Sequence, residues 1–304
     1  MNGKISNFQE IASLRRYTLT EGRERDISVI DCDNGKLRFL LNASKALDIM
    51  QLYHEGQNVS FISKNAFTVK DYPFIRRFEG GMLYTCGLDS AGGGRPDFEM
   101  HGTFHGLAPE ITRAVCDESG ITVEATVRDT ALFGKNLVMK RRIFTAIGSD
   151  TLTLSDTLVN EGYRDENYCL LYHINAGYPM LDEGARIEAD VREVEARSEL
   201  AKATVDSMLR ITADVPNQRE TCYFLKLGSP TVALVNPKIG KRLSVSYSQD
   251  TLPYFVEWKS MASGDYALGL EPTTTELGNK FTYRTVRAGE RVDFKVSITV
   301  SREA

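Results

Sequence analysis

Three short polar segments of this chain contain the residue types that acid–base chemistry needs. They are Met100-His101-Gly102, Tyr172-His173-Ile174-Asn175 and Leu270-Glu271-Pro272. The chain has only four histidines, and two of them lie in these segments. Two imidazoles and a carboxylate can donate and accept protons near neutral pH. The set therefore predicts general acid–base catalysis on a neutral, polyhydroxylated substrate.

Each of these three residues also has a structural interpretation. His173 ends an apolar strand pattern, where a histidine satisfied by hydrogen bonds in the core is a common arrangement. Glu271 also ends an apolar run, so its carboxyl group must be paired or must have a shifted pKa. A structural ion pair explains Glu271 nearly as well as a catalytic base does. His101 precedes a glycine in a polar loop and could equally cap or pack.

A metal site is a weaker interpretation of the histidines. His101 and His105 are four residues apart, a spacing that lets two side chains bind one metal ion from a helix. Gly102 and Gly106 make a helix unfavourable there. We therefore expect no metal, with His105 structural or at a rim. A metal-dependent sugar isomerase is kept as a third hypothesis. His54, in a hairpin turn, is expected to be exposed.

Composition excludes several classes of function. The 304 residues are 42% hydrophobic and 26% charged, with a net charge of −4. This charge gives no reason to expect binding to nucleic acid or to an anionic membrane. No apolar run approaches the ~20 residues that cross a bilayer, and the start of the chain lacks a secretion pattern. Five separated cysteines without a CxxC spacing favour a reduced, cytoplasmic protein.

The hydrophobic pattern has a period of two along most of the chain, which indicates strands. Residues 27–30 and 37–40 predict a hairpin around Asp33-Asn34-Gly35. Three further strands are expected at 121–128, 136–146 and 151–160. Others are expected at 168–174, 220–226, 231–236, 242–247, 254–258, 267–271 and 292–300.

Helical patterns are few. By composition a helix is expected over residues 191–209, and a short one over 5–14. Many strands joined by hairpin turns, with almost no helices between them, predict antiparallel sheets packed face to face. We find no linker, and we expect one all-β domain over residues 1–304, a large antiparallel sandwich with a broad face for a ligand.

Taken together, the motifs resemble the aldose 1-epimerase (galactose mutarotase-like) superfamily. The resemblance is greater to a divergent bacterial branch of aldose-epimerase-like proteins whose biochemical role is largely uncharacterised. Each motif alone is weak, but the ordered set is fairly specific for the fold. The resembling segments are residues 78–81, 85–88, 100–102, 108–110, 172–181, 252–254, 258–259 and 269–272.

The resemblance implies a β-supersandwich that binds a sugar on a concave face and interconverts its α- and β-anomers without a cofactor. In such families a glutamate takes the proton of the anomeric hydroxyl, and a histidine protonates the ring oxygen. Glu271 matches this base and His173 matches this acid. His101 matches the second histidine, which binds and polarises the sugar.

Residues that bind the substrate are expected around these three. Candidates are Asn175, Asp48, Trp258 with its indole face, Lys259, and the pair Arg76 and Arg77. The related branch usually has an Asp-Arg-Gly-Met-Asp-Ile-like segment where this chain has residues 42–49. Its final Asp48-Ile49 is kept and its Arg-Gly is lost. Arg76, Arg77 or Arg95 could substitute. The glycine run 92–94 is expected to be a surface loop rather than a phosphate-binding loop, since no Lys-Ser/Thr follows it.

Two hypotheses from different classes follow. The first is an enzyme that interconverts the anomers of a free or modified sugar. The second is a carbohydrate-binding or sugar-sensing protein that kept the fold and lost catalysis, which the changed residues 42–46 favour. In both, the partner is a small carbohydrate, and neither nucleic acid nor a membrane is expected. The oligomeric state stays open, with a homodimer as one candidate.

Overall fold

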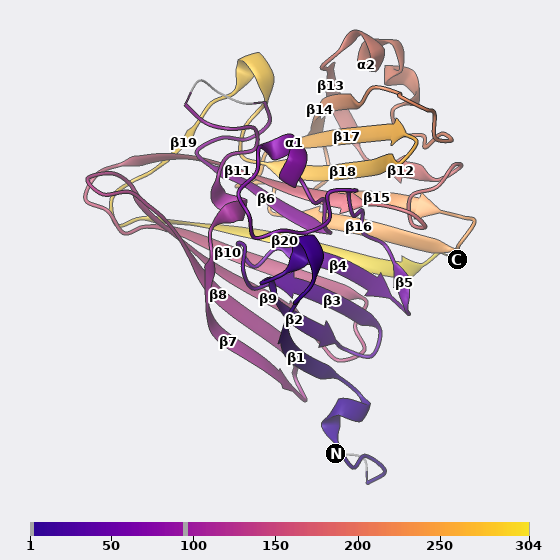
Figure 1. Ribbon diagram of the computed structural model, residues 1–304. Helices are drawn as coiled ribbons and strands as arrows, with labels where there is room; N and C mark the ends of the chain where they lie inside the picture. Colours follow the sequence, from indigo (N-terminus) through magenta and orange to yellow (C-terminus); the bar gives the residue numbers. More distant parts are fainter. Residues whose placement is uncertain (1–2, 94–96, 304) are drawn as a thin grey trace.

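Antiparallel strands make up most of the molecule, which we describe from a computed structural model over residues 3–93 and 97–303 (Figure 1). Arg95 and the last glycine of the run 92–94 lie outside the described residues. The strands form three sheets, and the helices are single turns at their margins. The all-β sandwich predicted from the sequence is therefore confirmed.

The first sheet has five strands in the order β1-β2-β3-β4-β5, and the second has eight in the order β12-β15-β16-β20-β10-β9-β8-β7. The third has seven strands. Its order is β13-β14-β17-β18-β11-β19, and β6 pairs with β11 beside β19.

The strands of the first sheet are β1 Ser13–Thr18, β2 Ser28–Asp33, β3 Leu37–Asn42, β4 Ile49–His54 and β5 Gln57–Asn58. Those of the second are β7 Pro109–Asp117, β8 Gly120–Thr130, β9 Asn136–Thr145, β10 Thr151–Asn160, β12 Arg186–Glu188, β15 Thr231–Asn236, β16 Lys241–Tyr247 and β20 Arg291–Arg302. Those of the third are β6 Leu83–Leu88, β11 Glu166–Ala176, β13 Val191–Ala196, β14 Thr221–Leu227, β17 Tyr254–Ala262, β18 Asp265–Thr273 and β19 Arg284–Val286.

The α-helices are α1 Phe74–Arg77 and α2 Glu199–Ala203, and each is a single turn. Short 3₁₀ turns are Phe8–Glu10, Gly22–Glu24, Phe104–Gly106, Val205–Ser207 and Gly278–Lys280. Both α-helices lie against the third sheet or its connections, so they cover strands rather than separate them.

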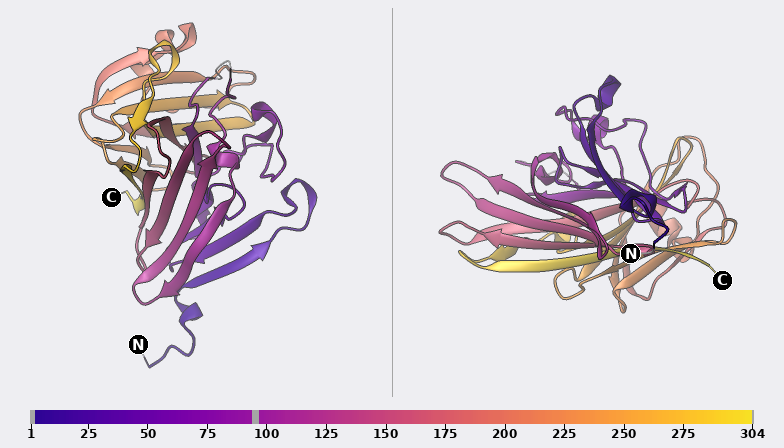
Figure 2. Two further views of the ribbon diagram at one scale, coloured as in Figure 1. Left: turned by 90° about the vertical axis from the view of Figure 1, so that its left-hand side faces the viewer. Right: turned by 90° about the horizontal axis from the view of Figure 1, so that it is seen from below.

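The largest core lies between the eight-stranded sheet and the other two sheets. In β10, Leu152, Leu154 and Leu158 are buried at alternate positions, as the sequence pattern predicts. The same cluster includes Phe39 from the first sheet and Tyr172 from the third. The indigo strands β1–β4 form a layer apart from the magenta strands β7–β10 (Figures 1 and 2). One face of the third sheet therefore belongs to the main core, and its other face is left for a separate cluster.

The first predicted hairpin is confirmed at β2 and β3. Gly35 has a φ of +90°, a conformation that favours glycine. The amide oxygen of Asn34 accepts hydrogen bonds from the N–H groups of Lys36 and Leu37, at 2.9 and 2.7 Å. The three strands expected between residues 121 and 160 correspond to β8, β9 and β10.

Both helix predictions are wrong in extent. Residues 191–196 form the edge strand β13, which pairs with β14, and only the single turns α2 and Val205–Ser207 follow. The composition of this segment suits a helix, but pairing with a neighbouring strand overrides that weak preference. Near the N-terminus, one 3₁₀ turn at Phe8–Glu10 precedes β1.

The prediction that His54 is exposed is also wrong. The residue is 1% exposed, and its ring lies between Lys241 and Asp150. Nδ1 is 2.7 Å from Lys241 Nζ, and Nε2 is 2.9 Å from Asp150 Oδ1. An ammonium group can only donate, so Nδ1 accepts and Nε2–H donates to the carboxylate. His54 thereby links the first sheet to the second.

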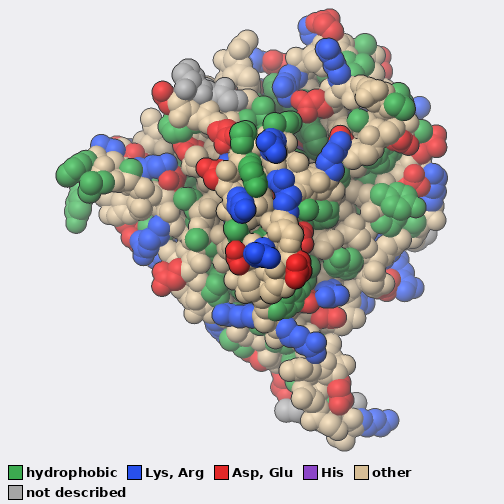
Figure 3. Space-filling view, viewed as in Figure 1, with side chains coloured by type: hydrophobic (Ala, Val, Ile, Leu, Met, Phe, Trp, Pro, Cys, Tyr) green, Lys and Arg blue, Asp and Glu red, His purple; other side chains and the backbone are tan. Residues whose placement is uncertain are grey.

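Charged side chains of both signs are interspersed over the face shown in Figure 3. Hydrophobic side chains gather at its left-hand tip, at the turn between β8 and β9, where Leu132 and Phe133 are 87% and 95% exposed. In the part of the chain that the structure describes, no helix is long and apolar enough to cross a membrane.

Candidate active site

Strand β11 places the candidate catalytic residues because it lies between β6 and β18. Ile174 pairs with Leu270, and His173 pairs with Tyr84. Alternation along β11 sends Tyr172 and Ile174 into the main core. His173 therefore points to the opposite face of the third sheet, which we call the site face. The same alternation in β18 places Glu271 on the site face, beside His173.

His173 and Glu271 form a close, buried pair. The Nε2 atom of His173 lies 3.1 Å from Oε1 of Glu271, although the two groups are not aligned as a hydrogen bond. The residues are 3% and 1% exposed. A Cβ atom on Gly269 would lie 2.2 Å from this Oε1 atom, far inside any normal contact. The carboxyl group therefore occupies space that only glycine at position 269 leaves open.

Asn175 determines which nitrogen of His173 carries a proton. The Nδ2 group of Asn175 donates to the carbonyl oxygens of Gly81 and His173, at 3.1 and 3.0 Å. This fixes the amide so that its Oδ1 atom faces His173 Nδ1, at 2.5 Å. Since Oδ1 can only accept, Nδ1 must be protonated. The lone pair of a neutral His173 ring then lies on Nε2, and it faces Glu271.

Burial shifts the pKa values of the pair in opposite directions. Burial lowers the pKa of His173 to about 4, opposed by the hydrogen bond to Asn175. Burial, followed by the charge of Glu220, raises the pKa of Glu271 well above its usual value. Both shifts disfavour the charged forms.

His101 lies next to this pair. Its ring is 5.3 Å from the His173 ring, between centroids, and nearly perpendicular to it. The residue has a φ of +64°, held by backbone hydrogen bonds to Gly92 and Gly87. Such a conformation in a residue other than glycine often marks a functional site. Burial, and then the charges of His173 and Arg197, lower the pKa of His101 well below its usual value.

Aromatic side chains cover the pair. The Phe78 ring lies 5.3 Å from the His173 ring, and Phe74 lies 5.0 Å from His101. Both phenylalanines belong to the α1 segment. Trp258 completes the cover, with its ring 5.4 Å from His173 and 6.3 Å from Phe78. Beneath these rings, His173 and Glu271 are almost inaccessible to solvent.

Two charged residues on the site face were not found by sequence reasoning. Glu220 accepts a hydrogen bond from Trp258 Nε1 at 2.6 Å, and Arg197 lies 3.2 Å from the same carboxylate. Neither residue belongs to a recognisable motif. Their nearness to Trp258 depends on the pairing of β13, β14 and β17, which the sequence does not specify.

The two predicted arginines lie at the margin of the site. Arg77 is half-buried and binds Asp71 and Glu99, at 2.7 and 2.6 Å. Arg76 is exposed, and its guanidinium group lies over the ring of Tyr72. Both arginines belong to α1, so they are next to the aromatic cover rather than next to the His173–Glu271 pair.

Asp48 and Lys259 do not reach the site face. Lys259 follows Trp258 and so points to the other side of β17, where it donates to the carbonyl oxygens of Met208 and Arg210. Asp48 is 2% exposed. We expected both to bind substrate, and the structure instead places their side chains in the core.

Asp48 belongs to a buried ionic network that joins the three sheets. It accepts hydrogen bonds from Arg141 Nη1 at 2.6 Å and from Thr85. It also contacts His105 Nδ1 at 2.7 Å. The network continues from Arg141 to Asp156 and Tyr172, and from His105 to Glu79 and Lys45.

His105 therefore has a structural partner on each ring nitrogen. Burial lowers its pKa, but the charge of Glu79 and the hydrogen bonds to both carboxylates raise it above its usual value. Within residues 3–93 and 97–303, no three side chains of His, Cys, Asp or Glu are grouped to hold a metal ion. Both ring nitrogens of His105 contact carboxylates, so the spacing of His101 and His105 does not create a joint site.

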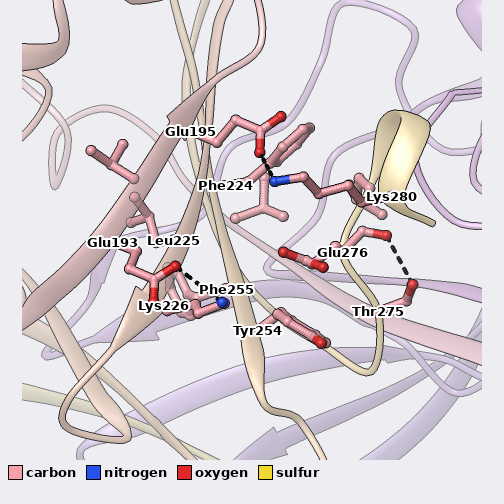
Figure 4. Close-up of a pocket in the computed structure, with 13 residues that line it drawn as sticks. Glu193, Glu195, Phe224, Leu225, Lys226, Tyr254, Phe255, Thr275, Glu276 and Lys280 are labelled. Atoms are coloured by element: carbon pink, nitrogen blue, oxygen red, sulfur yellow. Dashed lines mark hydrogen bonds and ion pairs between the residues drawn. The ribbon is translucent and has the colours of Figure 1, made fainter. Parts of the chain in front are cut away.

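A pocket of about 150 Å³ lies farther along the third sheet (Figure 4). Phe224 and Val256, from the site face, are part of its lining, and His173 and Glu271 are not. Lys280 extends toward Glu195 across the pocket, and Lys226 contacts Glu193. The pocket is therefore next to the candidate catalytic pair and does not contain it.

The sheet arrangement defines the class of fold, a galactose mutarotase-like β-supersandwich. Residues 24–300 match the family described as Domain of unknown function (DUF4432), and the chain belongs to this family. No curated protein matches the chain.

Solved structures share this fold at low sequence identity. A proposed aldose 1-epimerase from Klebsiella pneumoniae has a TM-score of 0.85 and 17% identity, over 96% of this chain and 84% of that one. A galactose mutarotase-like protein from Clostridium acetobutylicum has a TM-score of 0.69 and 12% identity, over 96% and 99%. A galactose 1-epimerase from Lactobacillus acidophilus has a TM-score of 0.65 and 12% identity, over 96% and 100%.

Proposed function

We propose that this protein is a mutarotase-like isomerase that interconverts the α- and β-anomers of a free sugar. The observation that carries the proposal is the buried pair of His173 and Glu271, with Nε2 and Oε1 3.1 Å apart. An imidazole and a carboxyl group held this close suit a reaction that removes a proton at one oxygen and adds one at another. Solved structures of the same fold include proteins named as aldose or galactose 1-epimerases.

In the proposed reaction, the Glu271 carboxylate takes the proton of the anomeric hydroxyl as His173 Nε2–H gives a proton to the ring oxygen. The C1–O5 bond breaks, and the electrons of the former O1–H bond form the aldehyde carbonyl. Rotation about C1–C2 presents the other face of the aldehyde. Reclosure reverses both transfers, so no proton is gained or lost overall.

The other residues position the sugar. Asn175 keeps Nδ1 protonated and holds Nε2 toward Glu271. The Nδ1 atom of His101 accepts weakly from the Gly92 N–H at 3.4 Å, which leaves Nε2–H as a donor for a sugar oxygen. The indole face of Trp258 suits the apolar face of a pyranose ring. The sugar displaces Phe78 from above His173 and lies against Trp258, and its hydroxyl groups then solvate the charged form of the pair.

The test is saturation-exchange NMR of the anomeric protons over a panel of aldoses. We expect the protein to accelerate exchange for at least one sugar, and Glu271→Gln to lower kcat by about 100-fold or more, as loss of a general base does. Glu195→Gln is the matched control, because Glu195 contacts Lys280 in the neighbouring pocket. Equal loss in both variants would contradict the assignment of Glu271.

Sugar binding without exchange would favour the alternative of a carbohydrate-binding or sugar-sensing protein. That alternative is supported by the changed residues 42–46. Lys45, in this segment, lies 3.7 Å from the buried Glu79 carboxylate and is only 5% exposed. Residues 42–46 therefore contribute to the core of this protein. The role of the corresponding segment in the related branch is not assigned to them.

A further inference from the structure

We propose that the ion pair of Arg197 and Glu220 restricts the site to uncharged sugars. This inference rests on the proposed function and names the substrate class of the same site. It concerns two residues that are both distant from Glu271 in the sequence. The sheet brings them together on the site face.

Strand register places both residues on that face. Asn175, Gly269, Trp258 and Cys222 are paired in one row across β11, β18, β17 and β14. Side chains of directly paired residues in an antiparallel sheet point to the same side. The N–H group of Arg197 donates to the carbonyl oxygen of Cys222 at 3.0 Å, which extends the row by one residue.

Glu220 lies two residues before Cys222, so its side chain shares the same face. Its Oε2 atom accepts the hydrogen bond from Trp258 Nε1 at 2.6 Å, and its Oε1 atom lies 3.2 Å from Arg197 Nη1. Trp258 in turn is paired with Gly269, over which the Glu271 carboxyl group lies. The chain of contacts therefore runs without a break from the catalytic carboxyl group to Arg197.

In this arrangement the Glu220 carboxylate already pairs with the positive charge of Arg197 before a substrate binds. A sugar carboxylate would have to displace Glu220 from Arg197, or lie beside the negative charge of Glu220. A neutral hydroxyl group can instead donate to Glu220 and accept from Arg197 together. Along the same sheet, Lys226 and Lys280 are also paired with carboxylates, so these cations do not offer an alternative site for an anion.

For two exposed residues of opposite charge elsewhere on the protein, a surface ion pair without a role in the site would be a sufficient explanation. Here the pair also binds the indole ring that covers His173. The negative charge of Glu220 is close enough to add to the raised pKa of Glu271. Both observations connect Glu220 to the site rather than to the general surface.

The experiment compares sugars that differ only at C6, glucose with glucuronate and galactose with galacturonate. For each pair, kcat/KM is measured by exchange NMR and Kd by ligand-observed NMR titration, at one ionic strength. The proteins are the wild type, Glu220→Gln, the double variant Glu220→Gln/Arg197→Gln, and the control Glu195→Gln. A glutamine at 220 can still accept from Trp258 Nε1, but it leaves the charge of Arg197 unpaired.

We expect the wild type to prefer the neutral sugar in at least one pair. Glu220→Gln should shift the uronate-to-neutral ratio toward the uronate by about fivefold, the upper range for an exposed charge pair. The double variant should lose this gain, and Glu195→Gln should keep the wild-type ratio. Added salt should reduce the gain, because the charges are exposed.

Three results would overturn the inference. The wild type could prefer uronates, Glu220→Gln could leave the ratio unchanged, or Glu195→Gln could shift it equally. If no sugar shows exchange but the Kd ratios shift as expected, the proposed catalysis fails and the inference about charge stands. If exchange is accelerated and the ratios do not respond, the inference fails and the proposed catalysis stands. Absence of binding for all four sugars would reject both.

Discussion

At the scale of single residues, the chemistry depends on the environment that each side chain receives. Asn175 is polar and buried, and its amide is fixed by two carbonyl acceptors. That orientation protonates Nδ1 of His173 and turns the basic nitrogen toward Glu271. Burial then disfavours the ionised form of each group.

The lowered pKa of His173 predicts the pH dependence of kcat/KM. The active form has one mobile proton on the pair. As the pH falls through about 4, His173 becomes protonated while Glu271 keeps its proton, and the base is lost. Activity should therefore fall on the acid side with a midpoint near pH 4, rather than near the usual histidine value. A rate profile measured between pH 3 and 8 checks this, and an acid limb near 6.5 would contradict the assignment.

Gly269 predicts a second effect at this scale. An alanine there would place Cβ 2.2 Å from Glu271 Oε1 and 3.2 Å from His173 Cε1, so the carboxyl group must move. A displacement of about 1 Å can cost on the order of 100-fold in rate. We expect Gly269→Ala to lower kcat by that order. Gly106→Ala is the control, since no atom lies within 4 Å of its added Cβ. An unchanged kcat in Gly269→Ala would show that the carboxyl position does not limit the reaction.

At the scale of elements, we expect α1 to control access to the pair, because Phe74 and Phe78 of this segment pack against His101 and His173. It is a single turn, which is too short to be stable alone. Glu99 holds it in place by accepting from the Phe74 N–H at 2.5 Å and from Arg77 Nη2 at 2.6 Å. Loss of the Glu99 contacts should therefore uncover the site without changing a candidate catalytic residue.

Trp258 is the only tryptophan of the chain, so its fluorescence reports this cover. We expect Glu99→Gln to raise the acrylamide quenching constant of Trp258, because Phe78 packs against its ring from the α1 segment. Asp71→Asn should have little effect, since Asp71 is 92% exposed and its ion pair with Arg77 contributes little. Equal quenching in Glu99→Gln and the wild type would mean that α1 does not cover the site.

At the scale of the whole molecule, the buried ionic network joins the three sheets at one point. Arg141 comes from β9 and is fully buried, and it binds Asp48 beside β4 and Asp156 on β10. Thr85 on β6 and Tyr172 on β11 complete these contacts from the third sheet. Two carboxylates would lose their counter-charge together if Arg141 were removed.

Arg141→Met should therefore lower the free energy of unfolding by about 3–5 kcal/mol, as the loss of one partner of a buried pair does. Arg142→Met is a matched control on the same strand. Arg142 is paired with Glu124 at 3.4 Å and is 45% exposed, so its loss should cost less than about 1 kcal/mol. Urea unfolding measures both variants, and similar midpoints would contradict the structural role of the network.

The sequence by itself predicted many of the strands, because alternation of apolar and polar residues is a local property. It did not predict β1, β6, β7, β12 or β19. It identified β8, β9 and β10 closely, and it selected His173 and Glu271 by their positions at the ends of apolar runs. Its errors came from contacts that are not local. The segment at 191–209 looked helical until an edge pairing with β14 made it a strand. His54 looked exposed until Lys241 and Asp150 approached from distant segments.

The tertiary structure alone decided which polar residues share a face. The alternation of β17 separates Trp258 from Lys259, although they are neighbours in the chain. Sheet register brings Arg197 and Glu220 to Trp258, and folding draws Asp48 into the core with Arg141. A one-residue change of register would exchange the two faces of a strand. Membership of the site therefore depends on strand pairing, which short sequence motifs do not encode.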